Sequence, residues 1–229
     1  MKKTLDTLSV TQVSRVSASD HIAEALRSAI VDGLMQAGEP LKQDEIAARF
    51  SVSKIPVREA LKRLEAEGLV SFEKNRGAIV ATMSPEEIIE YLDIRALLES
   101  KAAELSAPRI TDATLETAAR YLDIFRRDIE PAHWSHLNWE FHSTLYRDAG
   151  RPILMAELRV LYDKLERYVR ALLVLNEAET PKTHTEHAAI LDAFARRDAK
   201  AAADLTRAHV LDAGASLVKH LNNHRLKGV

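Results

Sequence analysis

The sequence has no cysteine, and it is poor in glycine, proline and aromatic residues. Without cysteine the chain can form no disulfide, no thiolate metal ligand and no cysteine nucleophile. Only seven glycines and seven prolines occur in 229 residues, beside abundant alanine, leucine, arginine and glutamate, which favours helices. No apolar run approaches the ~20 residues that cross a bilayer, and Met1–Thr7 is followed by no apolar stretch of the secretory type. These absences predict a mainly helical cytoplasmic protein without a membrane partner.

The chain also lacks an excess of either charge, with 32 lysines and arginines against 34 aspartates and glutamates and a formal net charge of -2. Near-neutrality does not exclude nucleic-acid binding, because binding depends on where the positive charge lies. One stretch, residues 49–76, is locally basic. It holds seven basic residues, Arg49, Lys54, Arg58, Lys62, Arg63, Lys74 and Arg76, against four acidic ones, Glu59, Glu65, Glu67 and Glu73.

Hydrophobic periodicity predicts a small mixed unit in the first third of the chain. After Ser19, apolar residues recur at three- and four-residue steps, which predicts a helix that buries Ile22, Leu26, Ala29, Ile30 and Leu34. Two further helices and two short strands around a turn follow, at residues 43–50, 54–67, 69–73 and 78–82. We therefore predict an N-terminal arm over residues 1–18 and a winged helix–turn–helix DNA-binding domain over residues 19–82.

Ser84 opens a second part that contains helices only. Its side chain can cap a helix, Pro85 suits the first helical position, and Glu87 completes a capping box. Proline, glycine and one polar corner separate six expected helices, at residues 85–106, 112–130, 132–149, 151–177, 183–196 and 198–224. The predicted fold class is therefore mainly α, with a helical bundle over residues 83–229 that binds an effector and dimerises.

The third helix has the features of a DNA-reading helix. Its buried face is apolar, whereas basic and polar side chains gather toward its N-terminal end, where they can reach phosphates and guanine edges. The positive end of the helix dipole also favours phosphate there. The alternative is an ordinary solvated surface. The predicted DNA contacts are Ser53, Lys54, Ile55, Arg58 and Lys62 on this helix and Lys74, Arg76 and Gly77 in the wing.

Four residues of the helical part form a candidate metal site. Asn138 and His142 are four residues apart on one helix, and His187 and His209 stand beside apolar positions on the last two helices. Three neutral imidazoles with an oxygen ligand would bind a divalent metal, with zinc as the first expectation and nickel or manganese as alternatives. The alternative is a set of core histidines, each with its own hydrogen-bond partner. The remaining histidines are expected at the surface: His21, His133, His136, His184, His220 and His224.

Five segments of the first part, residues 26–33, 37–41, 52–61, 64–70 and 75–78, share one pattern, and VSKIPVREAL at residues 52–61 is its most specific portion. Together they resemble the DNA-binding domain of the GntR family of bacterial transcription regulators. The resemblance implies that this portion is the recognition helix and that Arg58 contacts DNA. The family usually has arginine at the position of Lys54, and lysine lacks the planar two-pronged contact of arginine to guanine.

A second pattern lies in the helical part, in residues 94–99, 138–145, 186–193 and 197–202 and at His209. It resembles the FCD-type ligand-binding domain of the FadR branch of this family, and the six expected helices resemble the VanR-like subgroup. Metal-binding members use one aspartate and three histidines. His142, His187 and His209 match the histidines, whereas Asn138 replaces the aspartate by a neutral and weaker oxygen ligand.

Arg95 is expected on the inward edge of the first bundle helix, where a buried arginine needs a partner. From the residues alone, that partner is Glu99 or an acid on a neighbouring helix. The resemblance implies instead that Arg95 faces the effector pocket, where it would bind a small organic acid together with the metal.

The combined prediction is a homodimeric transcription regulator, in the first instance a repressor, that binds a palindromic double-stranded DNA operator. A small organic acid effector and a divalent metal would control it. One rival is a metal-dependent enzyme, in which the histidines activate water, although no separate acid–base pair is evident near them. Another rival is a regulator whose effector binds without metal.

Overall fold

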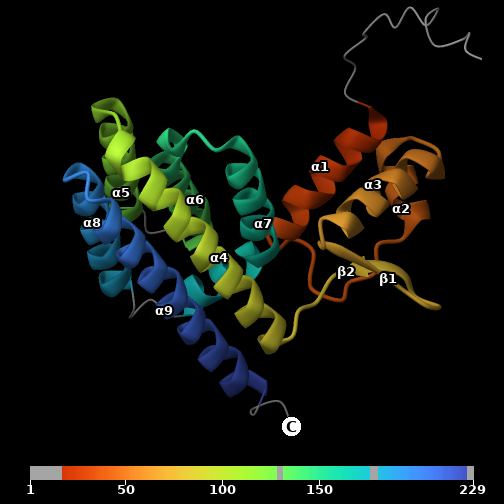
Figure 1. The fold of residues 1–229 in the computed structure, drawn as a ribbon. Helices are drawn as coiled ribbons and strands as arrows, with labels where there is room; N and C mark the ends of the chain where they lie inside the picture. Colours follow the sequence, from red (N-terminus) through yellow and green to blue (C-terminus); the bar gives the residue numbers. More distant parts are fainter. Residues whose placement is uncertain (1–16, 128–130, 176–179, 226–229) are drawn as a thin grey trace, which may run out of the picture.

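The structure is a computed structural model that describes residues 17–127, 131–175 and 180–225, nearly all of them in helices (Figure 1). A small first unit contains α1 (Ala18–Val31), α2 (Gln43–Phe50), α3 (Lys54–Ala66), β1 (Val70–Glu73) and β2 (Gly77–Val80). A larger bundle contains α4 (Pro85–Ser106), α5 (Asp112–Arg127), α6 (Pro131–Tyr146), α7 (Pro152–Leu175), α8 (Thr180–Ala195) and α9 (Ala199–Arg225). Short 3-10 turns lie at Ala107–Arg109 and Arg147–Ala149. The predicted fold class is confirmed.

The first unit has its own core, to which α1 and α3 contribute most. Ile22, Leu26 and Ile30 of α1 pack with Leu61 and Leu64 of α3, and all five are at most 4% exposed. Burying a side chain of this size stabilises a fold by about 1.5–3 kcal/mol. This core holds α3 at a defined angle and leaves its other side to the solvent.

The strands β1 and β2 form an antiparallel wing, in which Val70 lies opposite Val80 and Glu73 opposite Gly77. The turn between them contains Asn75 at φ 71°, and Gly77 has φ 75°. Asparagine and glycine are the residues that adopt such positive φ values most readily. The hairpin is therefore where the sequence predicts it, with strand ends at most two residues away from the expected ones.

One expectation for α1 is wrong. The helix begins at Ala18, where Ser17 and Asp20 form a capping box, and it ends at Val31. Gly33 then reverses the chain with φ 68°, so that Leu34 lies outside the helix and is 76% exposed rather than buried. Residues 1–16, most of the predicted arm, lie outside the described residues.

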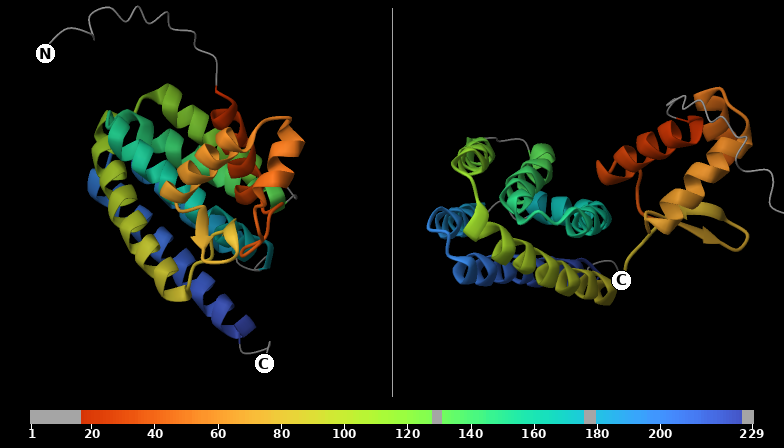
Figure 2. Two further views of the ribbon diagram at one scale, coloured as in Figure 1. Left: turned by 90° about the vertical axis from the view of Figure 1, so that its right-hand side faces the viewer. Right: turned by 45° about the horizontal axis from the view of Figure 1, so that its top comes forward.

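The bundle is organised around α4 and α9, which lie side by side in all views (Figure 2). α5 packs on α6, and α8 packs on α9. The large buried side chains Phe141, Tyr146 and Phe194 fill the space between these helices. α4 begins as predicted, because the Ser84 hydroxyl accepts the Glu87 N–H and the Glu87 carboxylate accepts the Ser84 N–H.

Two prolines begin helices rather than separating them. Pro181 lies in the first turn of α8, which starts at Thr180, three residues before the expected start, and Pro131 is the first residue of α6. Proline lacks an N–H, but the first-turn N–H groups of a helix have no intrahelical partner. Residues 128–130 and 176–179, which the predicted helices partly include, lie outside the described residues.

The two units meet where α1 packs against α7 (Figure 1). Close to this junction, the Met83 N–H donates to the Tyr168 hydroxyl at 2.8 Å. None of the described helices combines the length and the apolar character that a membrane crossing requires. A cleft between the units is lined in part by Arg27, Asp32, Trp139, Arg159, Tyr162 and Asp163.

Candidate functional site

The N-terminal end of α3 presents the predicted DNA contacts to solvent. Ser53 occupies the N-cap position but makes no capping hydrogen bond. Arg58 and Lys62 lie one turn apart on the exposed side, and Ile55 is 62% exposed. Apolar residues between these positions, such as Val57, are buried and anchor the helix. The N-terminal end of α3, with Ser53, Lys54 and Ile55, is thus exposed to solvent, as phosphate binding at this end requires.

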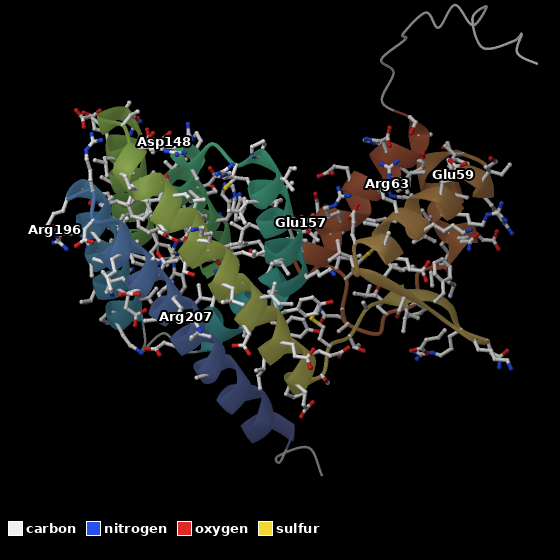
Figure 3. The ribbon with its side chains drawn as sticks, in the orientation of Figure 1. Glu59, Arg63, Asp148, Glu157, Arg196 and Arg207 are labelled. Carbon is white, nitrogen blue, oxygen red and sulfur yellow. The ribbon has the colours of Figure 1, made fainter. Side chains whose placement is uncertain are left out.

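Lys54 and Arg58 differ in their surroundings. The Lys54 ammonium lies 2.5 Å from the Asp44 carboxylate on α2, so that a DNA phosphate would have to compete with this ion pair. Among the described residues, no acidic side chain pairs with Arg58. Arg63 lies about 140° round the helix from Arg58, and it pairs with Asp20 of α1 (Figure 3). Arg58 is therefore the arginine of α3 whose guanidinium is available to DNA.

The wing presents a second set of predicted contacts. Lys74, Arg76 and Gly77 are exposed at the tip of the hairpin. The Arg76 guanidinium folds back to the Glu73 carboxylate at 2.8 Å and donates to the Gly38 carbonyl at 3.4 Å. Lys74 has no such partner among the described residues. At the tip, Lys74 can therefore contact a DNA phosphate directly, whereas Arg76 must first leave the Glu73 carboxylate.

The three predicted histidines meet inside the bundle. His142 comes from α6, His187 from α8 and His209 from α9, and all three are buried. The Nε2 atom of His187 lies 3.2 Å from Nε2 of His142 and 3.2 Å from Nε2 of His209. Asn138 lies one turn before His142 on α6 and is 7% exposed. The expectation that these four residues point inward is confirmed.

Hydrogen bonds outside the cluster determine which nitrogens carry protons. His209 Nδ1 lies 2.7 Å from the Glu186 carboxylate, which can only accept, so Nδ1 donates. The Tyr146 hydroxyl donates to Glu99 at 2.8 Å, and it must therefore accept from His142 Nδ1, 3.1 Å away. In a neutral imidazole the other nitrogen is then bare. With both rings in the neutral form, which is the form that binds metal, His142 and His209 thus direct Nε2 lone pairs toward His187.

His187 cannot satisfy both lone pairs. With its proton on Nε2 it can donate well to only one of the two neighbours, and its Nδ1 is buried without a partner. With the proton on Nδ1, three lone pairs converge. Unpaired buried polar atoms of this kind cost about 1–3 kcal/mol each. A cation at the centre would satisfy all three Nε2 atoms together.

The spacing of the cluster suits a transition-metal ion. Two nitrogens that are each about 2.0–2.1 Å from a metal and 3.2 Å from one another subtend an angle of about 100° at the metal. This value lies between the octahedral and tetrahedral angles, so His187 can occupy a ligand position adjacent to each of the other two imidazoles. The ligand nitrogens of all three histidines lie within 4.8 Å of one another. A fourth position would remain for Asn138, water or an organic ligand.

Burial lowers the pKa of both His142 and His187 well below the usual histidine value, and the neighbouring imidazoles lower it further. Each imidazole is therefore neutral at pH 7, the form that binds metal.

We expect the metal-free protein to lose stability below about pH 6.5, the ordinary histidine pKa. The unfolded chain takes up protons on both histidines there, whereas the folded protein does not, so stability is full above this pH and falls below it. The loss is at most about 1.4 kcal/mol per pH unit for each histidine. Urea unfolding of chelator-treated protein on both sides of this pH measures it. The His187→Gln variant lacks one of the two histidines and should therefore lose less stability below pH 6.5 than the wild type. An equal loss of stability in both proteins would contradict the expectation.

Arg95 is buried in an ion pair with Glu99, one turn later on α4. Its Nη2 donates to the Tyr162 hydroxyl at 2.7 Å, and the guanidinium carbon lies 4.0 Å from the centre of the Tyr162 ring. The partner that the residues alone suggest is thus present. The effector-binding role of Arg95 stays a prediction. The N–H groups that it has left for a ligand are on Nη1 and Nη2, because Nε donates to Glu99.

Sequence reasoning missed the hydrogen bonds behind the histidines and misplaced one histidine. Glu99 and Tyr146 are completely buried, and Glu186 is the acidic partner of His209. His184, expected at the surface, is only partly exposed. Its Nε2 atom is buried without a partner, and its ring packs against Phe125 at 5.2 Å. This placement follows from the packing of α8 on α5, which brings the His184 ring against Phe125.

Comparison with known families adds independent information. Residues 18–80 match the model of the bacterial regulatory proteins of the gntR family, and residues 90–212 match that of the FCD domain. The chain belongs to the GntR family of bacterial transcription regulators. α2, α3 and the wing of this GntR protein thus lie in its DNA-binding part, and the three histidines lie in its FCD domain.

Individual relatives agree with this assignment. The chain is 30% identical over 199 residues to the HTH-type transcriptional regulator BphR of Paraburkholderia xenovorans, covering 82% of this chain and 80% of that protein. It is 27% identical to the gluconate operon transcriptional repressor of Bacillus licheniformis, covering 79% and 74%. These relatives are regulators, so the protein is a transcription regulator and not an enzyme.

Solved structures share the fold over nearly the whole chain. A transcriptional regulator from Rhodococcus sp. RHA1 superposes with a TM-score of 0.76 at 26% identity, covering 88% of this chain and 97% of that one. McbR/YncC of E. coli gives a TM-score of 0.77 at 21% identity, covering 90% and 100%. The arrangement of a winged unit beside a helical bundle is therefore common to these proteins.

Proposed function

We propose that this GntR regulator is a repressor whose operator binding depends on a divalent metal at His142, His187 and His209 and on a small carboxylate bound beside it. The observation that carries the proposal is the convergence of three buried imidazoles, in which His187 Nε2 lies 3.2 Å from Nε2 of each of the other two. Zinc is the first expectation, and nickel or manganese are alternatives. The metal would supply a positive charge for the effector and tie α6, α8 and α9 together.

Two features support control by a carboxylate. Arg95 lies near the histidines, because its partner Glu99 also accepts from the Tyr146 hydroxyl, which contacts His142 Nδ1 at 3.1 Å. Its described hydrogen bonds use Nε and one Nη2 hydrogen, whereas a guanidinium has five N–H groups. The remaining donors suit an organic acid. Several relatives carry the word repressor in their names, among them the gluconate operon regulator of Bacillus licheniformis and GlaR of Escherichia coli.

The expected partner of the bundle surface is a second copy of the chain. Exposed apolar side chains lie on α4 and α7, and the two helices adjoin at a shallow hollow lined by residues of both. A palindromic operator requires two-fold symmetry, so a second copy of the chain is the partner that the DNA-binding role demands. Light scattering should give twice the chain mass of 25.6 kDa, whereas a monomer on the operator would contradict it. The exposed apolar residues are Ile94, Leu97, Ile153 and Val160.

The finer placement in the FadR branch and the VanR-like subgroup stays a prediction, which the six helices of the bundle support.

Operator binding tests the proposal directly. A duplex selected by the wild-type protein from a random library serves as operator, and fluorescence anisotropy measures its affinity for zinc-loaded and chelator-treated protein. D-gluconate and a panel of small carboxylates are the probes. We expect a carboxylate of the panel to weaken operator binding by about 5–150-fold, and only with metal present. Operator affinity that is the same with and without metal and with every probe would contradict the proposal.

A further inference from the structure

A buried carboxylate connects the two proposed ligand sites. Glu99 is 0% exposed. Its Oε1 accepts from Arg95 Nε, and its Oε2 accepts from the Tyr146 hydroxyl at 2.8 Å and from the Tyr162 hydroxyl at 3.4 Å. Since Tyr146 in turn accepts from His142 Nδ1, three hydrogen bonds lead from the guanidinium of Arg95 to the imidazole of His142.

We propose that Glu99 is a positioning residue that holds Arg95 on one side and, through Tyr146, holds His142 on the other. This inference rests on the proposed function, in which Arg95 binds the carboxylate effector and His142 binds the metal. It makes a single buried carboxylate the common support of both. Removal of this carboxylate should therefore affect both sites.

The candidate metal site contains only neutral ligands, so carboxylates behind the imidazoles would strengthen metal binding. The four residues of the candidate metal site, three imidazoles and the Asn138 amide, carry no negative charge. A carboxylate behind an imidazole makes the metal-facing nitrogen more basic and fixes the orientation of the ring. Glu186 does this directly for His209, at 2.7 Å. Glu99 does it for His142 through the hydroxyl of Tyr146, so that two carboxylates stand behind a neutral set of ligands.

Geometry also separates the two functions of Glu99. Tyr146 touches Glu99 and His142, whereas Tyr162 touches Glu99 and Arg95. Both tyrosines are buried and come from different helices, α6 and α7. Removing either hydroxyl leaves the Arg95–Glu99 ion pair intact, so Tyr146→Phe and Tyr162→Phe form a matched pair of variants.

Zinc affinity, measured by competition with a chromogenic chelator, is the first readout. We expect Tyr146→Phe to weaken zinc binding by about 10–100-fold, and Tyr162→Phe to leave it within about threefold of wild type. Glu186→Gln should match Tyr146→Phe, because it removes the equivalent support of His209. Glu99→Gln should weaken zinc binding as well. The Glu99→Gln variant leaves Arg95 buried without its ion-pair partner and can fail to fold. In that case the zinc affinity of Tyr146→Phe decides between the outcomes.

Nitrogen NMR of the zinc-free protein, which reports the tautomer of His142, is the second readout. If Glu99 and Tyr146 had a purely structural role, the variants would not change this tautomer. His142 should be in the Nδ1–H form in the wild type and in Tyr162→Phe, and it should lose this fixed tautomer in Tyr146→Phe. The Arg95 Nε–H signal should stay in place in Tyr146→Phe and shift in Glu99→Gln.

The outcomes separate this inference from the proposed function. Wild-type protein that binds no zinc overturns the proposed function and the inference with it. Wild-type protein that binds zinc, beside a Tyr146→Phe variant with the same zinc affinity and the same His142 tautomer, overturns the inference alone.

Discussion

Replacing Arg58 by alanine should abolish specific operator binding without unfolding the protein. Arg58 is exposed on α3 and free of acidic partners among the described residues, so its guanidinium has no structural duty that the substitution would disturb. Losing one base or phosphate contact costs about 1–3 kcal/mol, and a dimer loses it twice. The expected loss of operator affinity is therefore about 30-fold at least, measured by anisotropy on the selected duplex.

Arg63→Ala is the matched control on the same helix. Arg63 pairs with Asp20 of α1 and lies on a different side of α3, so its loss should change operator affinity by less than about threefold. Thermal unfolding of both variants verifies the fold. Normal operator affinity in a folded Arg58→Ala protein would disprove the assignment of α3 as the recognition helix.

Replacing His187 by alanine should remove metal-dependent stability. His187 lies between the other two imidazoles, at 3.2 Å from each, so its loss leaves two separated nitrogens. Metal at 100 times its dissociation constant stabilises a protein by about 2.7 kcal/mol, which corresponds to roughly 5–10 °C in melting temperature for a chain of this size. Added zinc should raise the melting temperature of the wild type by this amount and leave His187→Ala unchanged.

Two further variants sharpen this test. His136→Ala removes an exposed histidine and should keep the full response to zinc. Asn138→Asp adds a carboxylate one turn before His142 and should tighten zinc binding, because a charged oxygen is a stronger ligand than an amide. An equal zinc response in wild type and His187→Ala would show that zinc binds elsewhere on the chain.

Local signals predicted the elements of the fold well where they are strong. The capping box at Ser84 and the following Pro85 placed the start of α4 correctly, since each signal acts within one turn. Leu34 was misplaced because periodicity continues past Val31 in the sequence, whereas the backbone reverses at Gly33. Pro181 was expected to separate two helices, and this was wrong. A proline stops a helix in its interior but is tolerated in its first turn, where Pro181 lies.

The candidate site shows the same division between local and tertiary information. Inward-facing histidines could be predicted from their apolar neighbours. Tyr146 follows His142 by four residues, so their contact could also have been found from helical spacing. The Glu186–His209 contact and the Asp44–Lys54 ion pair join different helices. Such pairs depend on how the helices pack, which periodicity alone does not determine.

Metal content measured on the purified wild type tests the central claim most directly. Elemental analysis, followed by zinc X-ray absorption of the loaded protein, should show one divalent ion per chain with three imidazole nitrogens at about 2.0–2.2 Å. Chelation should lower the melting temperature, and zinc should restore it. Protein that carries no metal, gains no stability from zinc, nickel or manganese, and melts identically in chelator would contradict the account, and the three histidines would then be core residues.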